Sequence, residues 1–451
     1  MPHPTHKTPT AQVPEAARNA GNRWRNLVFL FLSNTVSGFA QGITIIAIPW
    51  FIVHDLGSPG LNTGLMGGIQ LFIVFWGLFA GTLVDRYNRQ YLFLSINAIG
   101  AVVLGGIAFT GHQLEGGLPV PLLGLILVTT YMIFTIHYPN MYAFVQELFD
   151  KRWYGRVNSG IEMQGQLTNA MGMAAGSVLI SGAPEELPQA LNFLAPSLEA
   201  IAPEPWALPE IFTLNASTYC FAVLMISFIR YKPGPPKPRE RVLDRIRIGI
   251  NYLRNDKPLI VFGLCSYMIF TGVLVFFPVL LPSYVDNVLQ TEGLYMGLSE
   301  SSFALGALTS AVLGLSLANA IARSNKIRLI AILLLLGFLT HLFLGLMPSE
   351  FRLLGLAALF GLLNAGARIL RLTYILMVVP NYVIGRVNSI FSITNGLFRA
   401  MLILAIIPAF GGLGDAWQAR SGVLVLAAIN LTAFVLIICY YPKFDKTAAY
   451  G

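Results

Sequence analysis

The sequence predicts an all-α membrane protein of twelve transmembrane helices in two pseudo-symmetric six-helix bundles. Three observations support this prediction: an apolar composition, long uncharged segments and a pentapeptide that occurs twice. Hydrophobic residues make up 55% of the 451 residues and charged residues only 11%, whereas a soluble domain needs about a quarter of its residues charged. We therefore expect most of the chain to lie in a lipid bilayer.

Segments of about 20 apolar residues are long enough to cross a bilayer as helices. The first half of the chain contains six such segments, at 27–53, 61–84, 91–111, 119–148, 157–181 and 211–230. The second half contains six more, at 258–283, 295–322, 327–347, 352–379, 385–410 and 421–441. Strands of a membrane β-barrel would be about ten residues long and of alternating character. Helices are therefore the expected spanning elements.

The pentapeptide Gly-Arg-Val-Asn-Ser occurs at 155–159 and again at 385–389. Each copy lies at the polar edge of an apolar segment, and both copies follow one span and precede another. An internal repeat with this offset covers nearly the whole chain, as in transporters built from two related halves. We expect bundles at 27–230 and 258–441, a linker at 231–257, and tails at 1–26 and 442–451.

Positive charge is concentrated on one side of the predicted membrane. The net charge is +8, and most Lys and Arg residues fall in the tails, the linker and the loops that follow even-numbered spans. Only Arg352 and Arg420 fall in the opposite loops. By the positive-inside rule, both termini and the linker are cytoplasmic and the protein is a multi-pass protein of the cytoplasmic (inner) membrane. A nucleic-acid partner is not needed to explain the charge.

The linker begins with the proline-rich stretch Tyr231–Pro238, which predicts a stiff spacer. Apolar residues then recur at helical spacing between Arg239 and Leu259, which predicts an amphipathic helix on the cytoplasmic membrane surface; an ordinary solvated connector is the alternative. The segment 181–210 is rich in Pro and Glu and lacks Lys and Arg. It is expected outside, either covering the mouth of a cavity or forming a plain acidic loop.

No signal peptide is expected, because the segment before the first span is polar and has no apolar core. The three cysteines, Cys220, Cys265 and Cys439, lie in or beside apolar spans. This placement is typical of small buried hydrophobic residues rather than of disulfides or metal ligands. We expect no metal and no cofactor.

The loop after the second predicted span reads Gly81-Thr-Leu-Val-Asp-Arg-Tyr-Asn-Arg-Gln90. It resembles the signature of the major facilitator superfamily, although Asn88 stands where a glycine is usual and Gln90 where a second basic residue is common. The resemblance implies the major facilitator fold. It also implies that this loop forms a conformational latch between the halves, made of Gly81, Asp85, Arg86 and Arg89.

Physically, Asp85 would face the positive end of the helix that starts near Gly385, an attraction worth about 0.3 to 2 kcal/mol. The alternative is that these charges only anchor a short loop, which accounts for Arg86 and Arg89 but not for the carboxylate. A second resemblance is a pattern of single residues between Gly249 and Gly306, together with the repeated pentapeptide. This pattern is similar to a branch of the superfamily that contains macrolide-efflux proteins and the enterobactin exporter.

Polar side chains recur at helical spacing within several predicted spans, and ionisable residues there usually face a functional interior. With the two arginines of the tenth span they predict a substrate cavity between the bundles, as the resemblance also implies, lined by Asn34, Gln41, His137, Asn140, Gln166, Asn169, Asn364, Arg368, Arg371, Asn395 and Arg399. For the amides taken singly, hydrogen bonding between helices is the alternative. The surplus of arginine over intramembrane carboxylate leaves room for an anionic group on a substrate.

Proton coupling requires a titratable group in the cavity, and Glu162 and His137 are the candidates. Many antiporters of the superfamily carry an arginine in the fourth helix as part of a proton relay, whereas Thr130 and Tyr131 occupy that region here. For His137, beside Pro139, a hydrogen-bonded histidine at a helix kink is the alternative interpretation.

These features predict a secondary active transporter rather than an enzyme, because metalloprotease, nucleophile-elbow and phosphate-loop motifs are all missing from the sequence. The branch resemblance favours efflux of a small amphiphilic molecule, drug-like or siderophore-like, by alternating access, with proton antiport as an option. Import of a nutrient or a lysophospholipid, and a non-transporting membrane scaffold, are the alternatives. The expected partners are the small-molecule substrate, protons and membrane lipid, and the expected working state is a monomer.

Overall fold

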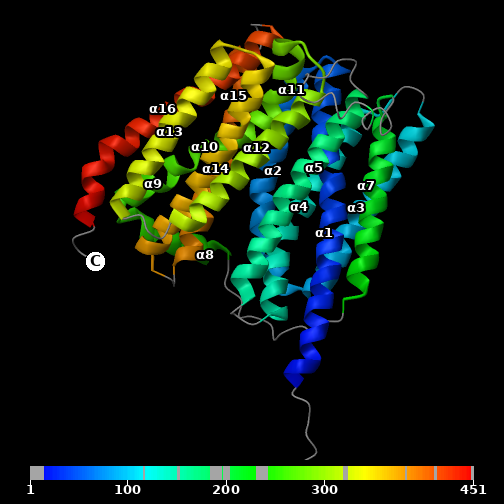
Figure 1. The fold of residues 1–451 in the computed structure, drawn as a ribbon, viewed down its shortest axis with the longest axis horizontal. Coiled ribbons are helices and arrows are strands. Elements are labelled where there is room, and N and C mark those ends of the chain that lie inside the picture. Colours follow the sequence, from blue (N-terminus) through cyan, green and yellow to red (C-terminus); the bar gives the residue numbers. More distant parts are fainter. Residues whose placement is uncertain are drawn as a thin grey trace, which may run out of the picture.

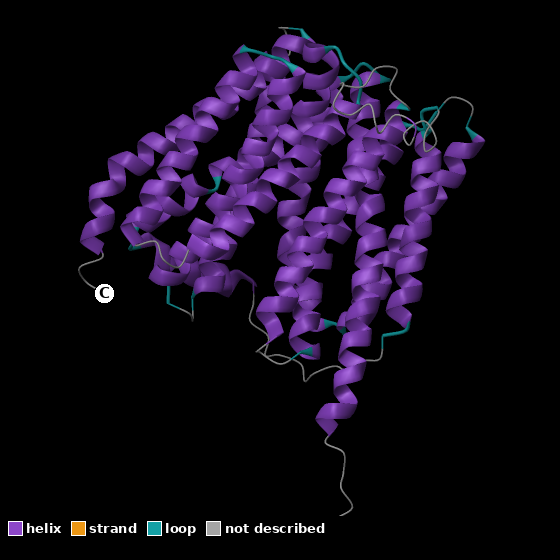
Figure 2. Cartoon of the chain, viewed as in Figure 1, coloured by secondary structure: helices purple, strands orange, loops and turns teal. Residues whose placement is uncertain are grey.

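The computed structural model is helical throughout its described residues (Figure 2). It describes residues 15–114, 117–149, 153–182, 196, 204–229, 242–317, 323–380, 383–410 and 414–447. Ten helices in these ranges are long and apolar enough to cross a membrane. Two further helices match the remaining two predicted spans, so the all-helical prediction is confirmed.

The first half contains six long helices, and each matches one predicted span. They are α1 (Glu15–His54), α2 (Pro59–Arg86), α3 (Arg89–Gln113), α4 (Val120–Leu148), α5 (Tyr154–Ser181) and α7 (Leu208–Ser227). The first helix begins earlier than the predicted span because Glu15–Arg25 is rich in helix-forming residues, although it is too polar to count as a membrane segment.

The second half contains the same number of spans, but its first one is interrupted. This seventh span is built from α9 (Lys257–Ser266), α10 (Met268–Val275), η3 (Phe276–Leu280), α11 (Leu281–Ser283) and η4 (Tyr284–Leu289). The others are α12 (Leu294–Leu317), α13 (Arg323–Leu346), α14 (Glu350–Val378), α15 (Ile384–Phe410) and α16 (Asp415–Thr447).

The seventh span is interrupted at Tyr267 and again near its prolines. Pro278 and Pro282 lack the backbone N–H that an α-helix needs, and the chain forms wider π-helical turns in η3 and η4. Carbonyl groups near Pro278 can therefore accept hydrogen bonds from side chains outside the helix. Asn62 of α2 donates through Nδ2 to the carbonyl oxygens of Pro278 and Val279, at 3.4 and 3.3 Å.

The two halves repeat the same packing (Figure 1). In the first half, α3 packs against α7, α1 against α5, and α2 against α4. In the second half the corresponding pairs are α13 with α16, α10 with α15, and α12 with α14. The halves meet through two further pairs of corresponding helices, α2 with α15 and α5 with α12. The structure is therefore the predicted pair of pseudo-symmetric bundles.

The contacts between the halves lie towards one face of the molecule. We call the face at which α1 begins and α16 ends the terminal face, and the opposite face, at His54 and Pro59, the far face. A Cβ atom placed on Gly67 of α2 would lie 2.7 Å from Leu404 of α15, and one placed on Gly293 would lie 2.9 Å from Trp50. Figure 1 shows the bundles diverging towards the terminal face. The molecule is thus closed at the far face.

A short helix, α8 (Val242–Arg254), lies in the region of the predicted linker helix. It packs against the start of α15, because a Cβ atom on Gly249 would lie 3.1 Å from the carbonyl oxygen of Arg386. Leu253 is buried, whereas Arg247 and Arg254 are exposed. The proline-rich stretch before α8 and most of the acidic segment 181–210 lie outside the described residues.

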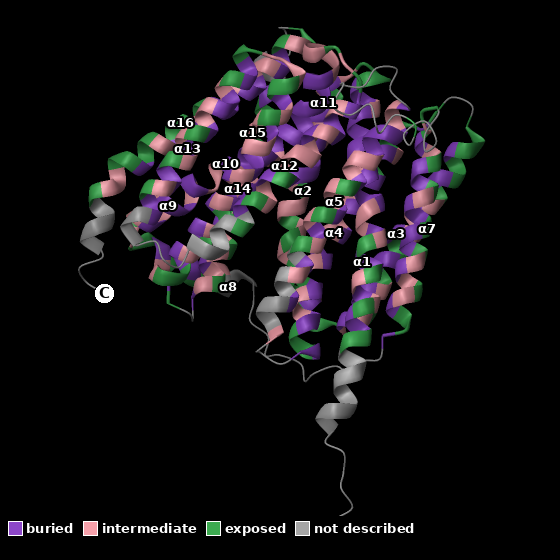
Figure 3. Ribbon diagram, in the orientation of Figure 1, coloured by how far each residue is buried: buried purple, intermediate pink, exposed green. Residues whose placement is uncertain are grey.

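Large apolar side chains are exposed along the sides of both bundles (Figure 3). Val102 and Phe351 expose 74% and 75% of their surface. Polar side chains such as Thr44, Asn215 and Asn430 are instead fully buried. This distribution is the reverse of that in a soluble protein and fits a chain whose solvent is lipid.

Candidate functional site

Side chains from both halves meet at the centre of the interface. We call this group, Gln70 of α2, Tyr131 of α4, Phe270 of α10, Glu300 of α12 and Arg399 of α15, the central cluster. Arg399 donates through Nε and a terminal nitrogen to Oε1 of Gln70, at 3.1 and 2.7 Å. Its guanidinium carbon lies 6.0 Å from the centre of the Phe270 ring. A charged residue of one half is therefore held by a neutral amide of the other.

Tyr131 lies near two other ionisable members of the central cluster. It interacts electrostatically with Arg399 and with Glu300. All three side chains are deeply enclosed by protein but keep part of their surface accessible. The cluster presents a cation, a carboxyl group, a phenol and an aromatic face to one region.

Only Arg399 of the central cluster was among the residues predicted to line the cavity. Tyr131 had been noted only because it stands in place of an arginine, and Gln70, Phe270 and Glu300 were not identified. The sequence did contain a signal for Glu300, since it is the one carboxylate in the predicted span 295–322. Gln70 and Phe270 had no such signal, because amides and aromatics are common in membrane helices.

A second polar group lies inside the first half and joins three helices. His137 Nε2 of α4 lies 2.7 Å from Asn34 Oδ1 of α1, and Asn34 Nδ2 donates to Gln164 Oε1 of α5 at 3.1 Å. Gln164 in turn donates to the carbonyl oxygen of Phe31 at 2.6 Å and to the hydroxyl of Thr35. Among the described residues, His137 Nδ1 is buried without a hydrogen-bond partner. We call His137, Asn34 and Gln164 the inner network.

Two other predicted cavity residues also point into the first half. Asn140 is fully buried, and its Nδ2 donates to the carbonyl oxygen of Arg89 in α3 at 2.9 Å. Gln41 donates to the Tyr219 hydroxyl of α7 at 3.1 Å. Both amides hydrogen-bond between helices of one bundle, as the alternative interpretation of single amides expects.

The arginines of the tenth span occupy different surroundings. Arg371 is buried, donates to the carbonyl oxygen of Ser266 at 3.0 Å and lies 3.6 Å from the centre of the Tyr267 ring. It therefore joins α14 to α9 within the second half. Arg368 is exposed and interacts electrostatically with Arg371.

The remaining cavity candidates are distributed over α5, α14 and α15. Asn395 is buried and donates to the hydroxyl of Thr271 in α10. Gln166, Asn169 and Asn364 are partly exposed. Glu162 lies within α5, but its side chain is outside the described ones. Of the predicted set, the structure brings Arg399 to the interface, gathers Asn34 and His137 within the first half, and keeps Arg371 within the second.

The latch residues lie at the terminal face, at the end of α2. Gly81, Asp85 and Arg86 are exposed there, and Gly385 is exposed at the start of α15. Arg89 is buried, with Nε 3.4 Å from Glu147 of α4. The bundles diverge at this face (Figure 1).

Both departures from the family signature have local functions. The side-chain oxygen of Asn88 accepts hydrogen bonds from the backbone N–H groups of Gln90 and Tyr91 and so caps the N-terminus of α3. The amide of Gln90 donates to the carbonyl oxygens of Ile226 and Ile229, at 3.0 and 2.8 Å. These two residues fix the start of α3 against the end of α7.

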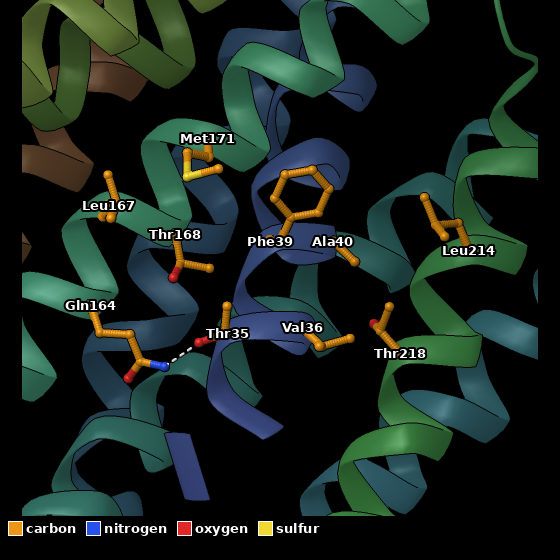
Figure 4. Close-up of a pocket in the computed structure, with 10 residues that line it drawn as sticks. All are labelled: Thr35, Val36, Phe39, Ala40, Gln164, Leu167, Thr168, Met171, Leu214 and Thr218. Carbon is orange, nitrogen blue, oxygen red and sulfur yellow. Dashed lines mark hydrogen bonds between the residues drawn. The ribbon is translucent and has the colours of Figure 1, made fainter. Parts of the chain in front are cut away.

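A separate groove of about 430 Å³ lies between α1, α5 and α7 (Figure 4). Six of its ten lining residues are apolar, and Leu167 and Met171 among them are largely exposed. Figure 4 shows Gln164 directed towards Thr35 at one end of the groove. All the lining residues belong to the first half, so the groove is distinct from the central cluster.

The model of the Major Facilitator Superfamily matches residues 30–403. The enterobactin exporter of Shigella flexneri is 26% identical over 414 residues, covering 90% of this chain and 91% of the relative. The enterobactin exporter of an Escherichia coli O1:K1 strain is also 26% identical, over 419 residues with the same coverage.

Solved structures share the fold at low sequence identity. A bacterial homologue of the human lysosomal transporter Spinster, in an inward-facing and unoccupied conformation, superposes with a TM-score of 0.68 at 14% identity, covering 94% of this chain and 98% of the other. The nucleoside transporter NupG gives 0.65 at 13% identity, covering 92% and 99%. Two related bundles of membrane-spanning helices and a family match over most of the length lead to one conclusion: the chain belongs to the major facilitator superfamily and is a transporter rather than an enzyme.

Proposed function

We propose that the protein exports a small amphiphilic molecule, drug-like or siderophore-like, from the bacterial cytoplasm by alternating access. The observation that carries the proposal is the pair of hydrogen bonds from Arg399 to Gln70. These bonds join a cation of one half to the other half at the centre of the interface. When the halves rock about the site, the distance between Arg399 and Gln70 has to change. The group to which Arg399 donates its hydrogen bonds therefore depends on the conformation.

Arg399 supplies the part of the site that would hold an anionic group. Its two hydrogen bonds to Gln70 use a single acceptor oxygen, whereas guanidinium has five N–H donors in a fixed fork that suits a carboxylate, a phosphate or a phenolate. The Phe270 ring and Tyr131 would pack against the apolar part of the substrate. An amphiphile is the class of molecule that uses both surfaces.

The proposed orientation in the membrane rests on the distribution of Lys and Arg, and the proposed direction of transport rests on the similar proteins. The excess of Lys and Arg at the terminal face supports a location in the inner membrane with both termini in the cytoplasm. The structure would then be open to the cytoplasm. The two relatives at 26% identity are enterobactin exporters, which supports outward transport of a siderophore-like substrate. Proton exchange through Glu162 or His137 and a monomeric working state belong to the same proposal.

The test uses inverted membrane vesicles, in which an exporter accumulates substrate in the lumen. Wild-type vesicles energised with a proton gradient are expected to accumulate an anionic amphiphile, and Arg399→Gln is expected to abolish that uptake while sparing a neutral analogue. Arg352→Gln is the matched control, because Arg352 lies at the far face and donates to the carbonyl oxygen of Met347 in its own half. Equal losses for charged and neutral analogues would count against anion binding.

The rival function is import of a nutrient or a lysophospholipid. Accumulation in right-side-out vesicles, with loss from inverted ones, would support import. A growth comparison of cells lacking and overproducing the protein, across antibiotics, dyes and siderophores, then narrows the substrate class. Export predicts greater tolerance on overproduction, whereas import predicts greater sensitivity to toxic substrates.

A further inference from the structure

The groove between α1, α5 and α7 lies deep in the bilayer, which limits what can occupy it. Leu167 and Met171 on its rim expose 51% and 55% of their surface. Gln164, at one end of the groove, is ten residues from the start of α5, and Met171 is ten residues from its end. At 1.5 Å per residue, both therefore lie about 15 Å from an end of the helix. This depth is in the hydrocarbon region, away from the phospholipid headgroups.

Two hydroxyl groups in the groove have hydrogens without an acceptor in the described part of the chain. A threonine in a membrane helix commonly donates to a carbonyl oxygen of its own helix, as Thr218 on the α7 side of the groove does to Asn215 at 2.7 Å. Thr168 of α5 forms no hydrogen bond within that part of the chain. Thr35 of α1 accepts one from Gln164 and donates none there. Both hydroxyls are therefore available as donors.

The inner network ends at the Thr35 hydroxyl. A carbonyl oxygen can only accept, so the atom of Gln164 that lies 2.6 Å from the Phe31 oxygen is the amide nitrogen. The Gln164 oxygen then accepts from Asn34 Nδ2, and Asn34 Oδ1 accepts from His137 Nε2. Gln164 also donates to the Thr35 oxygen. Every bond of the network is thus directed towards the groove, and the Thr35 hydrogen is its last donor.

Lipid tails cannot satisfy these two donors. Hydrocarbon offers no acceptor, so a hydroxyl hydrogen that faces it remains unpaired at a cost in free energy. Figure 4 shows Thr35 and Thr168 next to each other, with Phe39 and Met171 further along the groove. A molecule that satisfies both hydroxyls therefore has an acceptor oxygen at this end and an apolar body beyond it. A net charge on that molecule is unfavourable at this depth.

We propose that the groove binds a small, uncharged, apolar molecule that is dissolved in the bilayer and carries a ketone or ether oxygen. The oxygen accepts from the hydroxyls of Thr35 and Thr168, and the apolar body packs on Phe39 and Met171. A phospholipid does not have this shape, because its ester oxygens lie near the headgroup. The site belongs to the first half alone, and it does not depend on the proposed transport function.

The probe is benzophenone, which has two apolar rings, one ketone oxygen and no hydrogen-bond donor. On illumination its ketone carbon bonds to a nearby C–H group, so labelling of Met171 reports occupancy. The full chain in lipid nanodiscs is illuminated over a range of probe concentrations, and labelled peptides are identified by mass spectrometry. Labelling of Met171 is expected to saturate, because the groove is a site of limited capacity.

Two competitors measure the contribution of the acceptor oxygen. Dicyclohexyl ketone and dicyclohexylmethane have the same rings and differ only in the oxygen, and their concentrations are expressed as mole fractions in the lipid. The ketone is expected to displace benzophenone from Met171 roughly fivefold more effectively, which corresponds to one net hydrogen bond. Equal displacement by the two competitors would overturn the proposal.

Three variants assign the preference to the two hydroxyls. Valine has nearly the shape of threonine without the hydroxyl, so the double variant Thr35→Val, Thr168→Val should lose the preference for the ketone and keep its affinity for the hydrocarbon. Thr218→Val is the matched control, because this hydroxyl lines the same groove but donates to its own helix. Arg399→Gln, at the central cluster, should leave Met171 labelling unchanged.

Three further results would contradict the site: labelling of Met171 that rises without saturation, an unchanged ketone preference in the double variant, or an equal loss of preference in Thr218→Val. Should the double variant fail to fold, the two competitors on the wild type still decide. These readouts are independent of flux. Ketone-selective binding in a protein that exports nothing would contradict the proposed function and support the site.

Discussion

His54 at the end of α1 and Asp286 in η4 lie 2.7 Å apart and join the two halves at the far face. The His54 ring stacks on Trp50 with 4.6 Å between ring centres, and Asp55 follows in the chain. Burial raises the pKa of the Asp55 carboxyl, the His54 charge opposes that rise, and Asp286 adds to it. The far face is thus closed by a contact that contains a histidine, the residue type that changes charge near neutral pH.

Closure of the far face is expected to depend on the contact between His54 and Asp286, because it joins the two halves at 2.7 Å. Exposed ion pairs contribute about 0.2 to 1 kcal/mol, so His54→Ala should raise the open population by up to roughly fivefold. The population open at the far face can be measured by the distance between spin labels at Leu114 and Leu346, which are exposed in opposite halves. Equal distance distributions in His54→Ala and the wild type would contradict the prediction.

Gly67 is expected to be required for the close approach of α2 to α15. A leucine there would collide with Leu404, because its Cβ atom alone would lie 2.7 Å from the Leu404 side chain. Gly67→Leu should therefore shift the molecule towards a state that is open at the far face, as seen by cysteine labelling of interface positions. The matched control is the adjacent Gly68→Leu, since a Cβ atom on Gly68 meets nothing within 4 Å. A similar labelling pattern in both variants would show that the contact is unimportant.

Asp85 is expected to stabilise the state that is closed at the terminal face. Its attraction to the N-terminus of α15 is worth about 0.3 to 2 kcal/mol, so Asp85→Asn should raise the population open at this face by roughly 2- to 30-fold. Spin labels at Phe228 and Leu376, exposed near the terminal face in opposite halves, report this population. Thr82→Ala is the control, because Thr82 is exposed one turn earlier on α2. Cysteine accessibility identical to that of the wild type would refute the latch.

The inner network is expected to stabilise the first half. Asn34→Ala leaves His137 Nε2 and Gln164 Oε1 without the partner described above, and an unmet buried polar group costs about 1 to 3 kcal/mol. The thermal unfolding midpoint in detergent should fall, and the effects of Asn34→Ala and Gln164→Ala should not add, because both break one bond. Gln166→Ala, two residues further along α5, provides the control. Strictly additive effects would show that the network has no joint role.

The spans were predictable from the sequence because the bilayer requires long apolar helices, and the repeat offset assigned them to two halves. The central cluster was not, since Gln70 and Arg399 are 329 positions apart and only packing of α2 on α15 brings them together. Helical spacing did place Arg368 and Arg371 on one face of a helix. It could not reveal that Arg371 turns towards Tyr267, because a single helix carries no information about its neighbours. The same limit explains why His137 was predicted without Gln164.

The π-helical turns of the seventh span have a consequence for how the far face opens. Two carbonyl groups of this region, those of Pro278 and Val279, accept hydrogen bonds from Asn62 of the opposite half. An ordinary α-helix could not replace the bond to the Pro278 carbonyl, because the residue four positions later is Pro282, which has no backbone N–H. We therefore expect opening to be accompanied by a local change of winding near Pro278. The seventh span would then change its helical pitch over a few residues while the other helices of the bundle keep their shape.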